Sequence, residues 1–153
     1  MTSARMAAKT SMEMREVILW VHVLCGVAWI GTSASFVIAA AAIAGEERER
    51  REFVARTAPR IGRLCAIIAC VIPLTGLVNL AYVVHARSAA LPAEFTGILA
   101  AKIALFAAMV AALGVAQRGP RQRDARVRAP SLYGVMAALG TIALALGLWL
   151  SGT

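Results

Sequence analysis

The stretch ILAAKIALFAAMVAALGVA, residues 98–116, is uncharged except for Lys102. About 20 mostly apolar residues are enough for a helix that crosses a bilayer, so this stretch predicts a membrane-spanning helix. A charged side chain at membrane depth costs roughly 2.5–3.5 kcal/mol on insertion scales and is retained only for a reason. The stretch therefore predicts the class of the protein and one residue of a functional site.

The composition of the whole chain agrees with this class. Hydrophobic residues make up 60% of the 153 residues, charged residues only 16%, and the mean hydropathy is +0.74. A soluble domain is nearer half apolar and a quarter charged. Four stretches are long and apolar enough to span a bilayer, residues 17–44, 61–84, 96–116 and 132–150. The predicted fold is all-α, a polytopic membrane protein with one four-transmembrane-helix bundle over residues 17–151, after an outer tail of residues 1–16.

The Lys and Arg residues other than Lys102 are distributed unevenly, with Arg63 at the start of the second span counted in the first connection. Eleven of them lie in the first and third connections, whereas four lie in the N-terminal tail and the second connection. By the positive-inside rule the first and third connections are cytoplasmic. We therefore expect a multi-pass membrane protein with both termini outside. The net charge of +8 comes from these flanking residues, which attract anionic lipid and do not indicate nucleic-acid binding.

Glycine and proline residues predict the helix boundaries. We expect Gly45 to end the first helix and Pro59 to begin the second, because the missing N–H of proline costs little in a first turn. Residues 46–56 are expected to continue as a short helix or turn. Pro73 lies inside the second span and predicts a kink. Gly119-Pro120 is expected to break the third helix, and Pro130 to precede the fourth.

Two further patterns follow from the proposed topology. Aromatic residues enriched at membrane interfaces fall near predicted helix ends, with Trp20, Tyr82 and Trp149 at outer ends and Tyr133 at an inner end. The fourth span also carries small residues at helical spacing, which allow membrane helices to approach closely. These small residues are Gly140, Ala143, Gly147 and Ser151.

Three polar residues inside the spans lie at one predicted depth. His22, Asn79 and Lys102 are each a few residues from the outer end of a helix, roughly 8–9 Å below the boundary at 1.5 Å per residue. Each has a simpler explanation: a hydrogen bond from His22 to a neighbouring carbonyl, interhelical bonding by Asn79, and extension of Lys102 to the interface. Their shared depth favours one site, with His22 and Lys102 facing each other. His85 is expected to be a solvated loop residue.

The cysteines and methionines are weaker candidates for a metal site than His22. Cys25, Cys65 and Cys70 show neither a CxxC motif nor zinc spacing, so we interpret them as small core residues. The N-terminal tail holds a group of methionines, which are candidate copper ligands because thioether sulfur binds Cu(I) well. Chance or alternative start sites also explain this group. The methionines are Met1, Met6, Met12 and Met14.

Several short motifs resemble a known group of membrane proteins. Leu19-Trp20-Val21-His22, followed by Ala28-Trp29-Ile30-Gly31, is similar to the opening of the four-helix family related to copper-resistance protein D (CopD) and of the bacterial membrane protoporphyrinogen oxidase family (HemJ). Arg60-Ile61-Gly62-Arg63-Leu64 and Ile72-Pro73-Leu74-Thr75-Gly76 resemble their second helix. Gly97-Ile98-Leu99-Ala100-Ala101-Lys102-Ile103 resembles the segment that holds their third-helix lysine.

The resemblance implies a membrane protein that handles a porphyrin or a metal. It implies His22 and Lys102 as the functional pair and His22 as the metal ligand. It also implies a protein of the bacterial inner membrane with an oxidase-like activity and haem b as cofactor. Besides His22 and Lys102, the expected haem-binding residues are Arg60 and Arg63 of the second-helix motif and Asn79 of the shared layer. Three functions remain open: a haem- or porphyrin-binding redox protein, a copper-handling protein with copper as its metal, and an accessory or structural subunit without a cofactor. A homo-oligomer or a larger membrane complex is also compatible with the sequence.

Overall fold

The computed structural model consists of four helices. They are α1 (Ser3–Ala42), α2 (Glu47–Ala86), α3 (Ala93–Arg118) and α4 (Arg123–Ser151). The structure describes the backbone of residues 3–43, 47–86, 92–118 and 123–151, and the side chains of residues 12–43, 47–85, 92–117 and 129–149. The chain therefore has the predicted all-α, four-helix fold.

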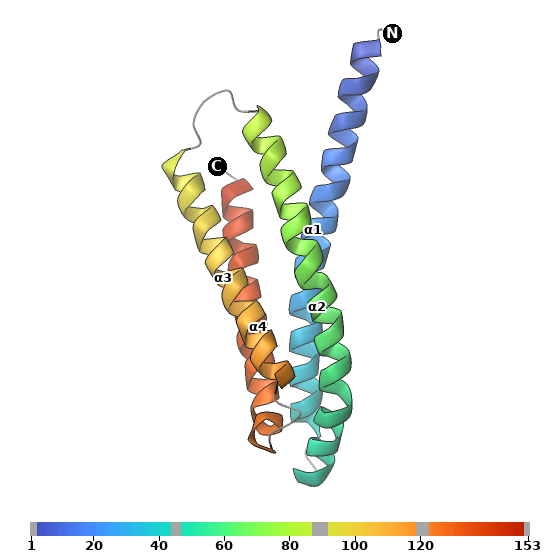
Figure 1. Cartoon of the computed structure of the whole chain (residues 1–153), viewed down its shortest axis with the longest axis vertical. Helices are drawn as coiled ribbons and strands as arrows, with labels where there is room; N and C mark the ends of the chain where they lie inside the picture. The colour runs from blue at the N-terminus through green and yellow to red at the C-terminus, as the bar shows by residue number, and fades with distance from the viewer. Residues whose placement is uncertain (1–2, 44–46, 87–91, 119–122, 152–153) are drawn as a thin grey trace.

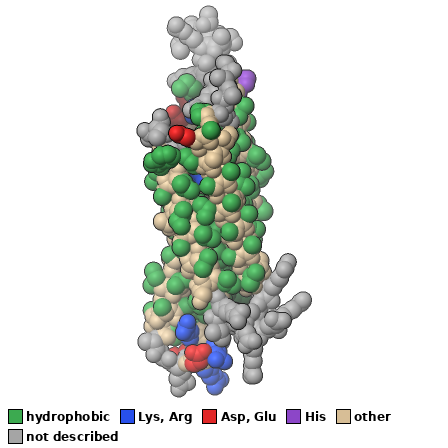
Figure 2. Space-filling view, turned by 90° about the vertical axis from the view of Figure 1, so that its left-hand side faces the viewer, with side chains coloured by type: hydrophobic (Ala, Val, Ile, Leu, Met, Phe, Trp, Pro, Cys, Tyr) green, Lys and Arg blue, Asp and Glu red, His purple; other side chains and the backbone are tan. Residues whose placement is uncertain are grey.

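All four helices are long and apolar enough to cross a membrane. The qualifying segments are Met12–Ala42, Glu47–His85, Ala93–Gln117 and Ala129–Trp149. Large apolar side chains face outward along them, for example Ile38, Leu74 and Leu148, each at least 64% exposed. In Figure 2 the visible flank is hydrophobic between charged ends. Such a surface is a liability in water but matches the acyl chains of a lipid bilayer.

The helices run alternately up and down, so the two chain termini lie at one end (Figure 1). We call this the terminus end. The opposite end, where α1 ends at Ala42 and α2 begins at Glu47, is called the arginine end. The closest helix pairs are α1 with α2, α3 with α4, and α1 with α4. The α2–α3 pair is in much looser contact, and in Figure 1 these two helices diverge toward the terminus end.

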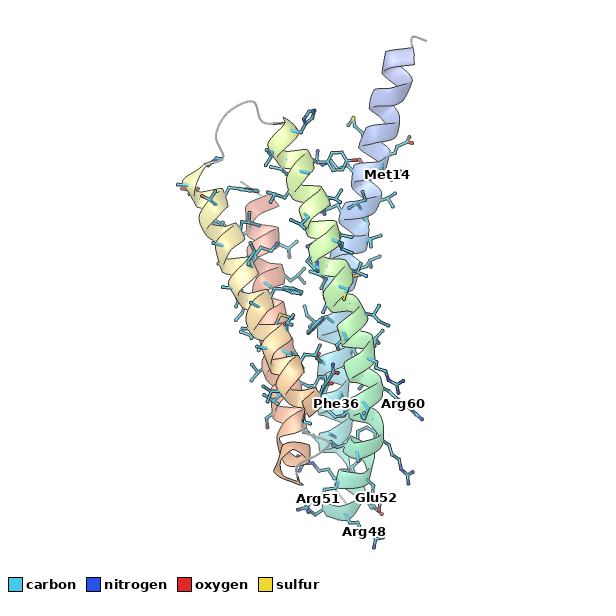
Figure 3. The ribbon with its side chains drawn as sticks, in the orientation of Figure 1. Met14, Phe36, Arg48, Arg51, Glu52 and Arg60 are labelled. Carbon is cyan, nitrogen blue, oxygen red and sulfur yellow. The ribbon has the colours of Figure 1, made fainter. Side chains whose placement is uncertain are left out.

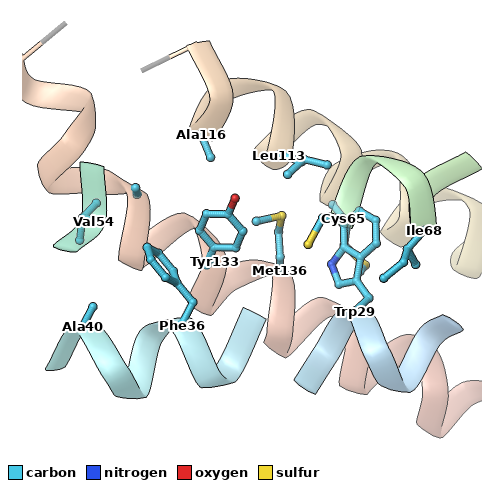
Figure 4. Packing of buried hydrophobic residues seen from close by; sticks show 12 residues of the cluster. Trp29, Phe36, Ala40, Val54, Cys65, Ile68, Leu113, Ala116, Tyr133 and Met136 are labelled. Atoms are coloured by element: carbon cyan, nitrogen blue, oxygen red, sulfur yellow. The ribbon is translucent and has the colours of Figure 1, made fainter. Parts of the chain in front are cut away.

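The tightly packed core occupies the half of the bundle nearer the arginine end. Among the described side chains, the largest that are fully buried are Trp29, Tyr133, Phe36 and Met136. The Phe36 ring meets Tyr133 edge-on at a centroid distance of 4.9 Å and stacks on Phe53 at 6.1 Å, as Figure 4 shows for the first pair. The layer that contains His22 and Lys102 lies outside this core, and its described side chains are at most half-buried.

Side-chain hydrogen bonds tie the other helices to α2 within the core. The Tyr133 hydroxyl donates to the carbonyl of Ala58 at 3.4 Å, and Gln117 Nε2 donates to the carbonyl of Gly62 at 3.1 Å. Both side chains come within 3.3 Å of the point where a Cβ of Gly62 would stand, so only glycine leaves them this room. The expectation that Tyr133 belongs to an interfacial belt is wrong, because it is 1% exposed and its hydroxyl is satisfied inside the bundle.

Two of the predicted helix boundaries are wrong. Pro59 lies inside α2 rather than at its start, and Pro130 lies inside α4 rather than before it. Residues 47–58 extend α2 backward because ion pairs at i,i+4 spacing, Arg48–Glu52 and Arg51–Glu47, stabilise that first segment. Pro130 is buried against the core, so packing holds α4 through it.

The remaining boundary predictions have mixed outcomes. The tail of residues 1–16 is helical from Ser3, as the start of α1, and it extends beyond the other helices (Figure 1). Pro73 lies inside α2 as expected. Gly45 and Gly119-Pro120 lie outside the described residues, just after α1 ends at Ala42 and α3 ends at Arg118.

Candidate functional site

His22 is held in place by α2. Its Nδ1 atom lies 3.1 Å from the carbonyl oxygen of Ile72 and 2.9 Å from the hydroxyl oxygen of Thr75. The Thr75 hydroxyl itself lies 2.9 Å from the carbonyl of Val71, to which it can donate. The simpler explanation of His22, a hydrogen bond to a neighbouring carbonyl, therefore holds in the structure, and the carbonyl is that of Ile72 in α2.

The two contacts of Nδ1 correspond to two tautomers of the imidazole. A Thr75 hydroxyl that donated to Nδ1 would put the ring proton on Nε2. The Ile72 carbonyl only accepts, so a bond to it carries the proton of the neutral ring on Nδ1, while the Thr75 hydroxyl donates to Val71. The lone pair then lies on Nε2, for which the described residues provide no hydrogen-bond partner. Metal-binding histidines typically use this arrangement, in which a backbone carbonyl orients the ring through one nitrogen and the other binds the ligand.

Gly76 provides the space for the imidazole. A Cβ at this position would stand 3.3 Å from His22 Cε1, tighter than an ordinary van der Waals contact. Gly76 follows Thr75 directly, so one short segment of α2 both orients the ring and makes room for it.

Lys102 lies against α4 rather than in lipid. Its Nζ atom is 3.0 Å from the point where a Cβ of Gly147 would stand, and the side chain is half-buried. Ile30 of α1 and Met109 of α3 both reach the point where a Cβ of Gly140 would stand. His22 and Lys102 lie eight and seven residues from them toward the terminus end, about 12 and 10.5 Å along their helices. Within the described residues Lys102 has no hydrogen bond and no acidic partner. The structure thus brings His22 and Lys102 into one polar layer.

Asn79 contributes a third polar group one turn of α2 beyond Thr75. Its Nδ2 atom is buried and has no hydrogen-bond partner among the described residues. The alternative role as interhelical glue therefore has no support in the described part of the bundle. An unpaired amide donor in an apolar environment costs free energy, which a ligand with an acceptor oxygen would recover.

The structure does not bring the two candidate arginines to this layer. Arg63 precedes Ile72 by nine residues, about 14 Å along the helix, and Arg60 lies farther still. Both are exposed near the arginine end. His85 is exposed, as expected, but it lies in the last turn of α2 rather than in a loop.

The sequence analysis did not predict two buried polar groups. Trp29 Nε1 and Ser33 Oγ are fully enclosed. Trp29 Nε1 has no hydrogen-bond partner within the described residues, and Ser33 Oγ has beside it only the thiol of Cys65, a weak partner. They lie one turn apart on α1, next to Cys65 of α2 (Figure 4 shows Trp29 and Cys65). Trp29 was visible in the sequence as part of a motif, but nothing in the sequence distinguishes Ser33 from other small residues of the span.

The cysteines and methionines do not assemble a metal site in the described residues. No group of three or more His, Cys, Asp or Glu side chains there is placed to hold a metal ion. Cys65 is buried and Cys25 packs against the core, whereas Cys70 is exposed. Met12 and Met14 are exposed on α1, and the side chains of Met1 and Met6 lie outside the described residues.

Comparisons with known proteins add no relative to this description. No protein-family model, no curated protein and no solved structure matches the chain. The site is therefore defined by its own geometry: an oriented imidazole, an ammonium group and an amide donor, in the loosely packed half of a four-helix membrane bundle.

Proposed function

We propose that the chain is an integral membrane protein that binds haem or a related porphyrin at the layer of His22 and Lys102 for a redox role. The observation that carries the proposal is the orientation of His22. Its Nδ1–H is held by the Ile72 carbonyl, which leaves the Nε2 lone pair free within the described residues. Histidine is a common axial ligand of haem iron, and a neutral imidazole is the form that binds.

Lys102 supports a ligand that carries negative charge. An ammonium group without an acidic partner is costly at membrane depth, and no described carboxylate lies near it. A porphyrin brings propionate groups, which Lys102 and Asn79 could bind through charge-assisted and neutral hydrogen bonds. The layer lies on the side of the bundle toward which α2 and α3, the neighbours in looser contact, diverge (Figure 1).

The chain's own residues would then have separate tasks. His22 would hold the iron through Nε2, and Thr75 and the Ile72 carbonyl would keep its ring in position. Lys102 would neutralise a propionate, and the surrounding apolar side chains would exclude water. Bound haem supplies a one-electron redox couple whose potential depends on the axial ligand and its hydrogen bonds. The oxidase-like activity that the family resemblance implies is an extension of this proposal.

Copper handling is the less favoured alternative. A copper ion on His22 would lie beside the Lys102 ammonium, and like charges repel strongly in an apolar environment. The third possibility is an accessory subunit without a cofactor, in which Lys102 and Asn79 would instead bind another membrane component. Both alternatives can be separated from the proposal by the optical spectrum and metal content of the purified protein.

The decisive experiment is the spectrum of full-length protein in detergent. We expect a Soret band that His22→Ala abolishes and that His85→Ala leaves nearly unchanged, because His85 is exposed at the end of α2. Copper analysis of the same samples tests the alternative. Wild-type protein with neither a Soret band nor copper would favour the accessory role, and a band that persists in His22→Ala would remove His22 as the ligand.

A further inference from the structure

An open groove runs between α1 and α2 near the arginine end. It has a volume of about 510 Å³ and is lined mainly by small and aromatic side chains, including Gly31, Phe36 and Phe53. A Cβ on Gly31 would meet nothing within 4 Å, so this face of α1 lies open. The groove is on the outside of the bundle, separate from the layer of His22 and Lys102.

Three hydroxyl groups line this otherwise apolar groove. They belong to Thr32 and Ser35 of α1 and Thr57 of α2. The hydroxyls of Thr75 and Thr141 donate to carbonyls of their own helices. By contrast, the described residues give Thr32, Ser35 and Thr57 no hydrogen bond. Hydroxyls that face a bilayer without a partner are costly, so these three indicate an occupant with acceptor oxygens.

Arginines without acidic partners stand beside the groove on α2. Residues 53–63 contain three arginines and no acidic residue. Arg48 and Arg51, nearer the start of α2, pair with Glu52 and Glu47. In the described part of the chain, Arg56 and Arg60 have no ion pair, and both are exposed. This end of α2 therefore offers two guanidinium groups for an anion.

The arginines and the hydroxyls are arranged by depth. Phe36 and Arg60 lie at about the same level along the bundle (Figure 3). Arg51 and Glu52, each of which has an ion pair with another residue, lie nearer the arginine end. Because α1 runs toward the arginine end, Ser35 and Thr32 lie about 1.5 and 6 Å farther into the bundle than Phe36. From the arginine end inward, Arg56 and the Thr57 hydroxyl come before Arg60, and the hydroxyls of Ser35 and Thr32 follow. The small residues Gly31 and Ala28 line the deepest part of the groove.

We propose that this groove binds one anionic phospholipid. The guanidinium groups of Arg56 and Arg60 bind the phosphate, with the forked geometry that suits its oxygens. The hydroxyls of Thr32 and Ser35 donate to the glycerol ester carbonyls, and an acyl chain lies along Gly31. A second copy of the chain is a poorer occupant, since it would bring the same unpaired arginines to the interface.

The test is native mass spectrometry of full-length protein offered equal amounts of phosphatidylglycerol and phosphatidylcholine with the same acyl chains. We expect the wild type to retain one phosphatidylglycerol in preference to phosphatidylcholine. The double variant Arg56→Gln with Arg60→Gln should lose at least five-fold of this retention. The matched control, Arg48→Gln with Arg51→Gln, should stay within two-fold, because those arginines are paired elsewhere. Equal losses in both variants would reduce the effect to general surface charge and overturn the proposal.

The groove itself is tested separately from the charges. Ser35→Leu fills it and should expel the lipid while Arg56 and Arg60 remain, with a monodisperse elution profile as the check on folding. If Ser35→Leu does not fold, Thr32→Val with Ser35→Ala removes the hydrogen bonds at nearly constant shape and should lower retention at least three-fold. Undiminished retention in these variants would overturn the proposal. So would a wild-type dimer that Gly31→Leu dissociates, since a second copy would then occupy the groove.

Discussion

His22 shows how much a single residue's surroundings decide its chemistry. The sequence places it inside a span, but a histidine there can equally be a satisfied core residue. The structure specifies which atoms are satisfied: Nδ1 is bonded to Ile72 and Thr75, and Nε2 is the nitrogen left for a ligand. That distinction was beyond sequence reasoning because it depends on how α1 and α2 are rotated relative to each other, and no local pattern encodes that rotation.

Gly76 gives the first test at this scale. A Cβ there would stand 3.3 Å from His22 Cε1, so Gly76→Ala should displace the ring by a few tenths of an ångström. If His22 binds haem, we expect a shifted Soret maximum and faster haem loss, with the fold retained. Gly97→Ala is the matched control, since a Cβ at Gly97 meets nothing within 4 Å. Identical spectra for both variants would show that the ring position is not set by Gly76.

Lys102 gives the second test. Lys102→Met keeps the length of the side chain but removes the charge that would bind a propionate. Hydrogen bonds to charged groups contribute about 1.5–3 kcal/mol, so haem transfer to a high-affinity acceptor protein should be about ten-fold faster or more. The Soret band itself should remain, because His22 is untouched. Unchanged transfer kinetics would mean that Lys102 serves something other than an anionic ligand.

At the scale of elements, hydropathy predicted the existence of the helices well but not their ends. The four apolar stretches all became helices because the bilayer requires internal backbone hydrogen bonding, and this requirement dominates local preference. The ends depended on weaker effects. Pro59 and Pro130 suggested helix starts, yet ion pairs and packing extended α2 and α4 past them. The prediction of a small-residue face on α4 was confirmed where its contacts are described, at Gly140 and Gly147.

Gly140 provides a test of that helix face. A Cβ there would stand 2.8 Å from Ile30 Cγ1 of α1, closer than real Cβ atoms approach. Gly140→Ala should therefore destabilise the bundle by about 1–3 kcal/mol, the usual cost of overpacking. Gly134→Ala, whose Cβ would meet Val37 at an ordinary 3.9 Å, should leave stability unchanged or slightly higher. The measurement is the thermal unfolding midpoint of each variant in one detergent, and equal midpoints would refute the close packing of α1 on α4.

The two halves of the bundle differ in how tightly their side chains pack. The half near the arginine end holds the buried aromatic core, in which Tyr133 and Gln117 anchor α4 and α3 to α2. The other half holds the polar layer and is more open. A loosely packed region with unpaired polar groups is where membrane bundles bind ligands, because such groups are retained only for function. The shared depth of His22, Asn79 and Lys102 was predictable from helix direction alone, whereas the two-part packing required the structure.

The orientation of the molecule in the membrane is the prediction that the charge distribution carries. The chain termini share one end of the bundle, and the end of α1, the start of α2, the end of α3 and the start of α4 lie at the other (Figure 1). Eleven Lys and Arg residues against four predict that the arginine end is cytoplasmic. In a background without Cys25, Cys65 and Cys70, we expect an impermeant thiol reagent to label Ser3→Cys in intact cells. Gln122→Cys should react only after the membrane is permeabilised, and the reverse pattern would place the layer of His22 and Lys102 in the cytoplasmic leaflet.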